Sequence, residues 1–344
     1  VGKLVYNVLY KWVEGWGIDS DLIGAFGVTV ILFTVFLTIL TLPLDIWQKM
    51  IGRSNSRKMR VMKPELDKIN KLYAADKNTL MMKQRELYKK YKYSTFKTCL
   101  PMLATVIIFF VIFSGFNSSV RYHNSVVYEE LRGVYNAAFE EAYVAADAAG
   151  ADAATANAQA TAAAEQAVLD AYKPESFLLT TSIFMPDTWK DPIPDVSTFT
   201  GTGLGSIGVP GIDAREYNDV MKPLIEKYNY TESGKSAWNG YLILPVLVTA
   251  LSIISSKLIN PPEQPQVAGQ TDEQVKAQQS QMKMMQYIMP IMMGVFSLFY
   301  SAAFSLYMFL RSFLSFAFNL IWNIVLKKRD AKQLDYEMSV TVKK

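Results

Sequence analysis

The sequence predicts an all-α polytopic membrane protein, with five transmembrane helices around a hydrophilic groove. The first reason is that 51% of the 344 residues are hydrophobic and gather in blocks at residues 26–44, 100–116, 241–259 and 287–326. A helix needs roughly 20 apolar residues to cross the hydrocarbon core of a bilayer. The first three blocks fit one crossing each. The last is twice that length, so it predicts two helices with a turn near residues 300–303.

The distribution of charge is the second reason, and it also predicts the orientation. Lys and Arg are retained on the cytoplasmic side of membrane proteins. Residues 51–96 contain thirteen basic and four acidic side chains, a net charge of +9, whereas residues 117–239 contain eight basic and seventeen acidic ones, a net charge of −9. Residues 327–344 are basic again, with six against three. This places the N-terminus outside and the C-terminus in the cytoplasm, which requires an odd number of crossings.

These two patterns divide the chain into ten segments. They are an outer interfacial amphipathic helix (1–22), transmembrane helix 1 (23–50), a cytoplasmic helical hairpin (51–96), transmembrane helix 2 (97–116), an enlarged acidic outer segment with an Ala-rich helix or helical pair (117–239), transmembrane helix 3 (240–259), a cytoplasmic linker (260–283), transmembrane helices 4 (284–300) and 5 (303–326), and a basic cytoplasmic tail (327–344).

The cytoplasmic hairpin is predicted from helical spacing. Met59, Met62, Leu66 and Ile69 follow one another at intervals of three and four residues, and a break at residues 76–78 separates them from a second helix. This spacing predicts two helices that share a narrow apolar interface. The basic residues expected to contact anionic headgroups or acidic partners are Arg57, Lys58, Arg60, Lys63, Lys83 and Arg85. The alternative is that their charge only marks a solvated face.

Polar side chains inside the predicted crossings indicate where a groove would lie. Such groups are costly at membrane depth and usually face protein or water. Two stripes stand out, one in the first crossing and one around Arg311 in the last. Their members are Thr34, Thr38, Thr41 and Asp45, and Ser301, Ser305, Ser312, Ser315 and Asn319. The alternative is that each hydroxyl bonds its own backbone and only tightens helix packing.

Several classes of protein are disfavoured because their residues are missing. The sequence has one cysteine, Cys99, and one histidine, His123, so it predicts no metal site and no cofactor. The crossings carry no pair of carboxylates and no nucleophile–base pair, which argues against an enzyme with catalytic residues. Nor do they show the repeated halves of an ion-coupled carrier. His123 is expected to be a solvated loop residue just past a membrane exit.

The order of these elements resembles the YidC/Oxa/Alb membrane protein insertases, in the compact form without a large outer domain before the core. The resemblance covers about two-thirds of the chain. The stretches that carry it are Leu42-Pro43-Leu44, Lys63-Pro64-Glu65, Leu87-Tyr88-Lys89, Cys99-Leu100-Pro101, residues 184–192, and residues 281–290 followed by Leu306-Tyr307.

The resemblance implies a groove that is open to cytoplasm and lipid but closed to the outside, in which a basic residue attracts acidic residues of a substrate. This sequence departs from the family there. Thr38 stands where the family has its groove arginine, Thr105 where it has a glutamine, and Ile107 where it has a proline. We therefore expect Arg311 to supply the charge. The expected groove residues are Thr34, Thr38, Thr41, Thr105, Ser305, Arg311, Ser312 and Ser315.

The function that the resemblance implies is insertion and folding of integral membrane proteins in the bacterial plasma (inner) membrane. The implied partners are nascent membrane proteins and anionic lipids, with the Sec translocon and the ribosome as further candidates, and no DNA. Two other classes stay open, a scaffold without insertase activity and a small solute transporter or channel. The missing arginine at Thr38 favours the scaffold, whereas a transporter needs a cavity across the whole membrane.

Overall fold

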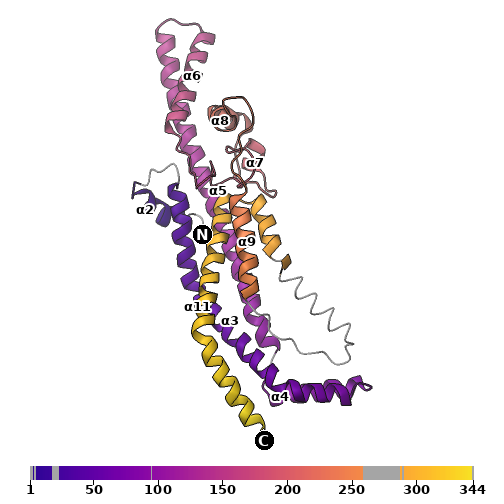
Figure 1. Cartoon of the computed structure of the whole chain (residues 1–344). Coiled ribbons are helices and arrows are strands. Elements are labelled where there is room, and N and C mark those ends of the chain that lie inside the picture. The colour runs from indigo at the N-terminus through magenta and orange to yellow at the C-terminus, as the bar shows by residue number, and fades with distance from the viewer. Residues whose placement is uncertain are drawn as a thin grey trace. The chain divides into compact units, whose positions relative to one another are not determined.

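The computed structural model describes residues 3, 5–17, 23–93, 95–258, 287–288 and 290–342, and these are mostly helical (Figure 1). The helices in chain order are η1 (Val5–Tyr10), α2 (Lys11–Glu14), α3 (Ala25–Leu72), α4 (Lys77–Lys90), α5 (Thr95–Ala148), α6 (Ala153–Ala171), α7 (Val196–Thr200), α8 (Ala214–Tyr228), α9 (Ile243–Leu258) and α11 (Ala302–Val342). A further helix covers Pro290–Phe299. In this part of the chain, extended pairing is limited to isolated bridges. The predominantly helical character is confirmed.

Two of the described helices are long and apolar enough to cross a membrane. They are Ala25–Leu72 and Ala302–Trp322, and the shorter Ile243–Ser256 and Pro290–Phe299 are also apolar. The second predicted crossing falls in α5, where the side chains of residues 94–102 and 105–106 lie outside the described ones. The predicted linker, residues 260–283, lies outside them altogether. The number of five crossings therefore stays a prediction.

The chain forms two compact units. Unit 1 consists of Val1–Thr34, Val111–Val248 and Met293–Leu310, and unit 2 of Val35–Phe110, Thr249–Met292 and Arg311–Lys344. Helices α3, α9 and α11 each begin in unit 1 and end in unit 2, whereas α5 begins in unit 2 and ends in unit 1.

Helix α3 continues through the predicted boundary between the first crossing and the hairpin. It has no break at residue 50 and contains both Pro43 and Pro64. A helix can leave a membrane without interruption, because its backbone hydrogen bonds are satisfied within the segment. Likewise, the segment predicted as a tail continues as helix α11 to Val342.

In unit 2, the end of α3 and helix α4 form the hairpin. Met59, Met62, Leu66 and Leu87 are buried together at its centre. The turn between the helices ends at Asp76, whose carboxylate accepts hydrogen bonds from the N–H groups at the start of α4. Such a cap satisfies donors that have no partner inside a helix.

In unit 1, the Ala-rich part of the outer segment folds as a pair of helices. The chain turns at Gly150, which has a φ of 82°, and α6 runs back beside the end of α5 (Figure 1). Buried residues recur along one face of α6, which lets a neighbouring helix approach closely. These are Ala156, Ala160, Ala164 and Val168. Lys222 of α8 forms an ion pair with Glu165 of α6 at 2.8 Å, so α8 lies against α6.

The segment at residues 175–187, which we call the capping segment, supplies hydrogen-bond acceptors to the first turns of α3 and α9. Its Glu175 carboxylate accepts from the Phe26 N–H at 3.0 Å, just inside α3. Its Asp187 carboxylate accepts from the N–H groups of Leu242 at 3.1 Å and Leu244 at 2.7 Å, at the start of α9. Both carboxylates thus satisfy donors that a helix leaves without partners.

The same segment also caps α11, this time with backbone carbonyls. The Ala302 N–H donates to Met185 O at 2.9 Å, and the Ala303 N–H donates to Ile183 O at 2.8 Å. Asn239 holds the segment in place. Its side chain is fully buried, accepts from the Ser182 N–H at 2.7 Å and donates to the Ser182 carbonyl at 2.9 Å. Three helix starts in unit 1 therefore share one source of acceptors.

Asp187→Ala should destabilise unit 1 by about 2–3 kcal/mol, because it leaves buried N–H groups at the start of α9 without an acceptor. Asp219→Ala on the exposed face of α8 is the matched control and should change the free energy of unfolding by less than about 0.5 kcal/mol. Chemical unfolding in mild detergent measures both. Equal stabilities for the two variants would contradict the capping role of Asp187.

Candidate functional site

A line of charged and polar side chains joins α3 to α11 within unit 2. We call it the charged seam and define it as Asp45, Lys49 and Arg53 of α3 with Arg311, Asn319 and Trp322 of α11. The α3 members are spaced by four residues, which places them on one helix face. At the first position, Arg311 Nη2 donates to Asp45 Oδ2 at 2.8 Å.

The ion pair between Asp45 and Arg311 is partly buried and makes only one hydrogen bond. The side chains are 20% and 27% exposed, respectively. The other terminal nitrogen of the guanidinium, Nη1, is buried and has no hydrogen-bond partner among the described residues. Bidentate pairing is the stronger arrangement for an arginine and a carboxylate. This pair therefore uses less than the full binding capacity of Arg311.

The remaining seam residues add positive charge. The Lys49 amine donates to Asn319 Oδ1 and lies 5.1 Å from the centre of the Phe318 ring. The Arg53 guanidinium lies 5.2 Å from the centre of the Trp322 ring, within reach of a cation–π attraction. The six seam residues thus include three basic side chains and one acidic side chain.

The predicted groove residues of unit 2 lie near this seam or bond locally. Ser312 is 3.4 Å from Ser252 of α9, between hydroxyl oxygens. The Thr41 hydroxyl donates to the Thr38 carbonyl at 3.3 Å, as expected for a hydroxyl that only tightens its own helix. Ser315 is half-buried on α11. The Thr105 side chain lies outside the described part of the structure.

Two predicted groove residues belong to unit 1 and are fully buried there. The Thr34 hydroxyl donates to the Val30 carbonyl at 2.7 Å. The Ser305 hydroxyl is 2.6 Å from that of Ser297 on the neighbouring helix. Both hydroxyls are satisfied by nearby protein atoms, which is how small polar residues tighten helix packing. The described residues of the predicted set are thus divided between the two units.

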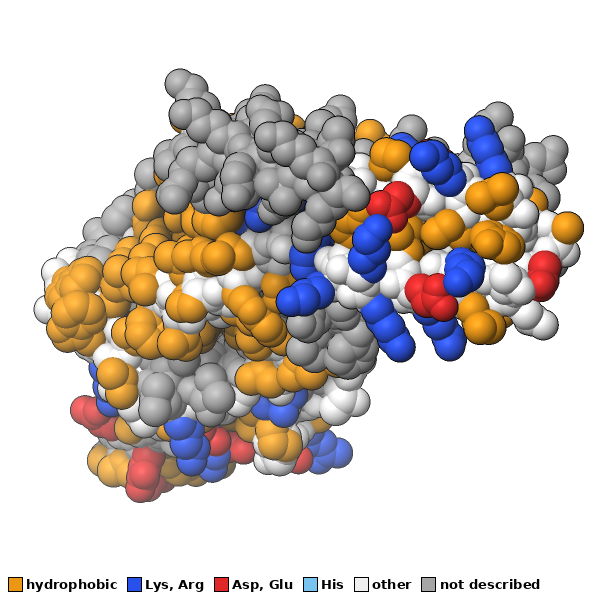
Figure 2. Space-filling model, turned by 90° about the horizontal axis from the view of Figure 1, so that it is seen from below, with side chains coloured by type: hydrophobic (Ala, Val, Ile, Leu, Met, Phe, Trp, Pro, Cys, Tyr) orange, Lys and Arg blue, Asp and Glu red, His pale blue; other side chains and the backbone are white. Residues whose placement is uncertain are grey.

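The predicted contact residues of the hairpin differ in their exposure and in the bonds they make within the hairpin. Arg60, Lys63 and Arg85 are exposed. The Lys58 amine donates to the Lys92 carbonyl at 2.9 Å, and Lys83 pairs with Glu86 at 2.8 Å. Figure 2 shows Lys and Arg side chains interspersed with apolar ones on its right-hand part. Arg57 is half-buried.

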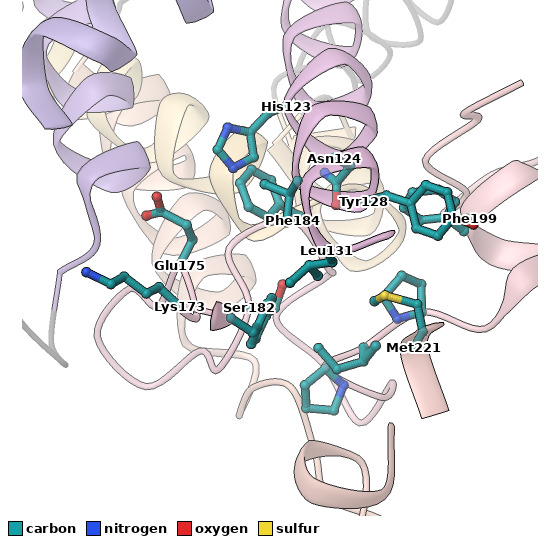
Figure 3. A pocket seen from close by; sticks show the side chains of 15 residues that line it. His123, Asn124, Tyr128, Leu131, Lys173, Glu175, Ser182, Phe184, Phe199 and Met221 are labelled. Carbon is teal, nitrogen blue, oxygen red and sulfur yellow. The ribbon is translucent and has the colours of Figure 1, made fainter. Parts of the chain in front are cut away.

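A small cavity of about 40 Å³ lies in unit 1, beside His123 of α5 (Figure 3). The prediction that His123 is a solvated loop residue is wrong, because its side chain is only 1% exposed. The ring centre lies 4.6 Å from that of Phe184 and 4.7 Å from that of Tyr10, so aromatic side chains from two other parts of the chain cover it. Neither ring nitrogen has a hydrogen-bond partner among the described residues.

Glu175 also lines this cavity, from the capping segment. Burial raises the pKa of its carboxyl, while the hydrogen bonds from the Phe26 N–H and the Tyr10 hydroxyl, the latter at 2.7 Å, lower it. Across the described residues, no group of three or more His, Cys, Asp or Glu could hold a metal ion. The volume of about 40 Å³ suits about three water molecules, since each needs roughly 10–15 Å³.

Comparison with known proteins decides the family. The model of the 60Kd inner membrane protein family matches residues 18–329, which is most of the chain. The chain belongs to the YidC/Oxa/Alb family. The resemblance predicted from the short motifs is thereby confirmed. No solved structure matches the chain.

Curated members of the family match parts of the chain. A "Membrane protein insertase YidC" of Fusobacterium nucleatum is 32% identical over 117 residues, which cover 34% of this chain and 55% of that protein. Proteins of the same name from Caldanaerobacter subterraneus (37% over 92 residues, 27% of this chain and 43% of that protein) and Bacteroides fragilis (32% over 123 residues, 35% and 18%) also match. The chain thus spans about half, or less, of the length of these relatives.

His123→Phe should weaken the loss of stability at acid pH. Burial lowers the pKa of His123 to about 3, whereas the unfolded histidine titrates near 6.5. Below pH 6.5 only the unfolded state takes up this proton, so the free energy of unfolding falls by about 1.4 kcal/mol per pH unit until the folded pKa is reached. Phenylalanine keeps a ring but cannot titrate.

The test compares unfolding of the two proteins in mild detergent at pH 7.5 and pH 4.5. The wild type should lose about 2–3 kcal/mol more than the variant between these pH values. His123 is the single histidine, so the difference isolates its titration from that of the carboxylates. Equal losses would mean that the His123 ring is protonated in the folded protein.

Proposed function

We propose that this chain is a membrane protein insertase and chaperone, which inserts integral membrane proteins and helps them fold through a polar groove open to cytoplasm and lipid. The observation that carries the proposal is the charged seam between α3 and α11, both of which contain spans apolar enough to cross a membrane. Charged side chains at membrane depth are rare and are kept for function. The names of the curated relatives agree with it.

In this mechanism the seam takes the part of the arginine that the family has at the Thr38 position. Arg311, Lys49 and Arg53 attract acidic side chains in a short outer segment of the substrate. A partly hydrated path lowers the cost of moving such a polar segment through hydrocarbon. The apolar part of the substrate then leaves sideways into lipid. Of the predicted groove residues, Thr38, Thr41, Ser312 and Ser315 belong to the same unit as the seam and would line the groove.

We further propose five crossings, with the N-terminus outside and the C-terminus in the cytoplasm. Support comes from the capping segment, because it bonds to the starts of α3, α9 and α11, which must therefore begin on one side of the membrane. In chain order α5 comes before α9, and the helix at Pro290–Phe299 comes before α11, so each would return the chain to that side. The net negative charge of residues 117–239 agrees with placing that side outside.

The proposed partners follow from the same arrangement. Nascent membrane proteins are the substrates, and the hairpin with its exposed Arg60, Lys63 and Arg85 faces them in the cytoplasm. Anionic headgroups are attracted by the same charges. The Sec translocon and the ribosome are further candidate partners.

A scaffold without insertase activity is the second candidate, and one observation favours it. The pairing of Arg311 with Asp45 neutralises the charge that would replace the family's groove arginine. If the remaining excess from Lys49 and Arg53 is too weak to attract a substrate, the chain would bind other membrane proteins without inserting them.

Complementation of a bacterial strain depleted of its own insertase separates the two candidates. The full chain should restore growth and the insertion of a single-span substrate with an acidic outer segment. Arg311→Ala should lower that insertion about tenfold, and adding Thr38→Arg to it should recover most of the loss, because about 1.4 kcal/mol of attraction is worth a factor of ten. Protease protection of the substrate measures insertion.

The matched control is Arg215→Ala, which removes an exposed arginine of α8 outside the seam and should leave insertion unchanged. Each variant must accumulate in the membrane to the wild-type level. Failure of the wild-type chain to restore growth would support the scaffold. Normal insertion by Arg311→Ala would remove Arg311 from the proposed mechanism.

A further inference from the structure

The ion pair at the start of the charged seam is built so that its carboxylate can be replaced. Asp45 holds Arg311 through one hydrogen bond of 2.8 Å, and the pair is neither sealed from its surroundings nor bidentate. Arg311 Nη1 remains without a partner among the described residues. A second carboxylate approaching Arg311 would therefore compete with a single bond, not with a closed fork of two.

Asp45 also has a place to go when it leaves Arg311. Lys49 lies one helical turn along α3, and side chains four residues apart on a helix are neighbours. The Lys49 amine donates to the Asn319 amide oxygen, and this acceptor is neutral. Replacement at Arg311 would thus exchange one ion pair for two. No charge would be left alone in a low-dielectric region, where an unpaired charge is costly.

We propose that Asp45 occupies the position at Arg311 that a carboxylate of an inserting segment takes, and that it thereby sets how strongly the groove prefers acidic substrates. The proposal rests on the insertase function proposed above. Without a substrate, Asp45 keeps the guanidinium paired. With one, the substrate carboxylate must displace Asp45 from Arg311, so its attraction is smaller than it would be for an unpaired arginine, and Asp45 can return when the substrate leaves. An uncharged segment cannot displace Asp45.

This makes Asp45 a specificity-determining residue with a counter-intuitive effect. Removing it should strengthen the preference for acidic substrates, because the competitor is gone. If the pair were only structural, removing Asp45 would weaken the packing of α3 on α11 and affect acidic and neutral substrates alike. The two roles therefore predict opposite results for a ratio of substrates.

The experiment uses the full-length protein in proteoliposomes and two forms of one single-span substrate. One form carries two aspartates in its short outer segment, and the other carries asparagines at the same positions. The ratio of the inserted amounts is measured by protease protection. Asp45→Asn should raise this ratio at least about threefold over the wild type. Arg311→Gln should lower it below the wild-type value, because the guanidinium for which the substrate and Asp45 compete is gone.

Asp67→Asn is the matched control, since it removes an acid of α3 outside the seam and should leave the ratio at the wild-type value. Asp45→Thr serves as a second variant with the same expected rise, in case the amide impairs folding. An unchanged or lower ratio in the folded Asp45 variants overturns the proposal. Insertion by wild-type proteoliposomes no better than by protein-free liposomes would overturn the insertase function itself.

Discussion

The arrangement of unit 1 depends on the hydrogen bonds between the capping segment and the starts of three helices. The first N–H groups of a helix have no partner inside it, and leaving them buried without acceptors is costly. Glu175, Asp187 and two backbone carbonyls supply those acceptors for α3, α9 and α11. Because one short segment serves all three, the helix starts are tied to one another.

The charged seam differs from the capping segment, because its arginine is only partly satisfied. Asp45 neutralises the charge of Arg311, but Arg311 Nη1 has no hydrogen-bond partner among the described residues. An arginine at membrane depth needs a partner, and Asp45 provides one. Two further basic side chains of the seam, Lys49 and Arg53, lie against the aromatic rings of Phe318 and Trp322. At the capping segment, in contrast, the helix starts find buried acceptors. The capped helix starts of unit 1 thus have their acceptors, whereas the seam of unit 2 leaves Arg311 Nη1 without a partner among the described residues.

The sequence predicts the features that depend on local patterns. Apolar blocks give the long helices, and the spacing from Met59 to Ile69 gives the hairpin interface. It does not predict contacts between distant residues, such as that of Asp45 with Arg311, 266 positions apart. The four-residue spacing of Asp45, Lys49 and Arg53 was the available signal for a charged face. The burial of His123 cannot be predicted either, because no local pattern shows that Tyr10 and Phe184 cover its ring.

The capping segment has a consequence for the order in which the protein is made. It follows α3 along the chain but precedes α9 and α11. In the proposed topology it is already outside, holding free acceptors, when the last helices emerge from the ribosome. Each later helix start that reaches the outer side is then retained by Asp187 or by the carbonyls of Met185 and Ile183. Hydrogen bonds to the capping segment would thus hold each later crossing in the membrane once its helix start has reached the outer side.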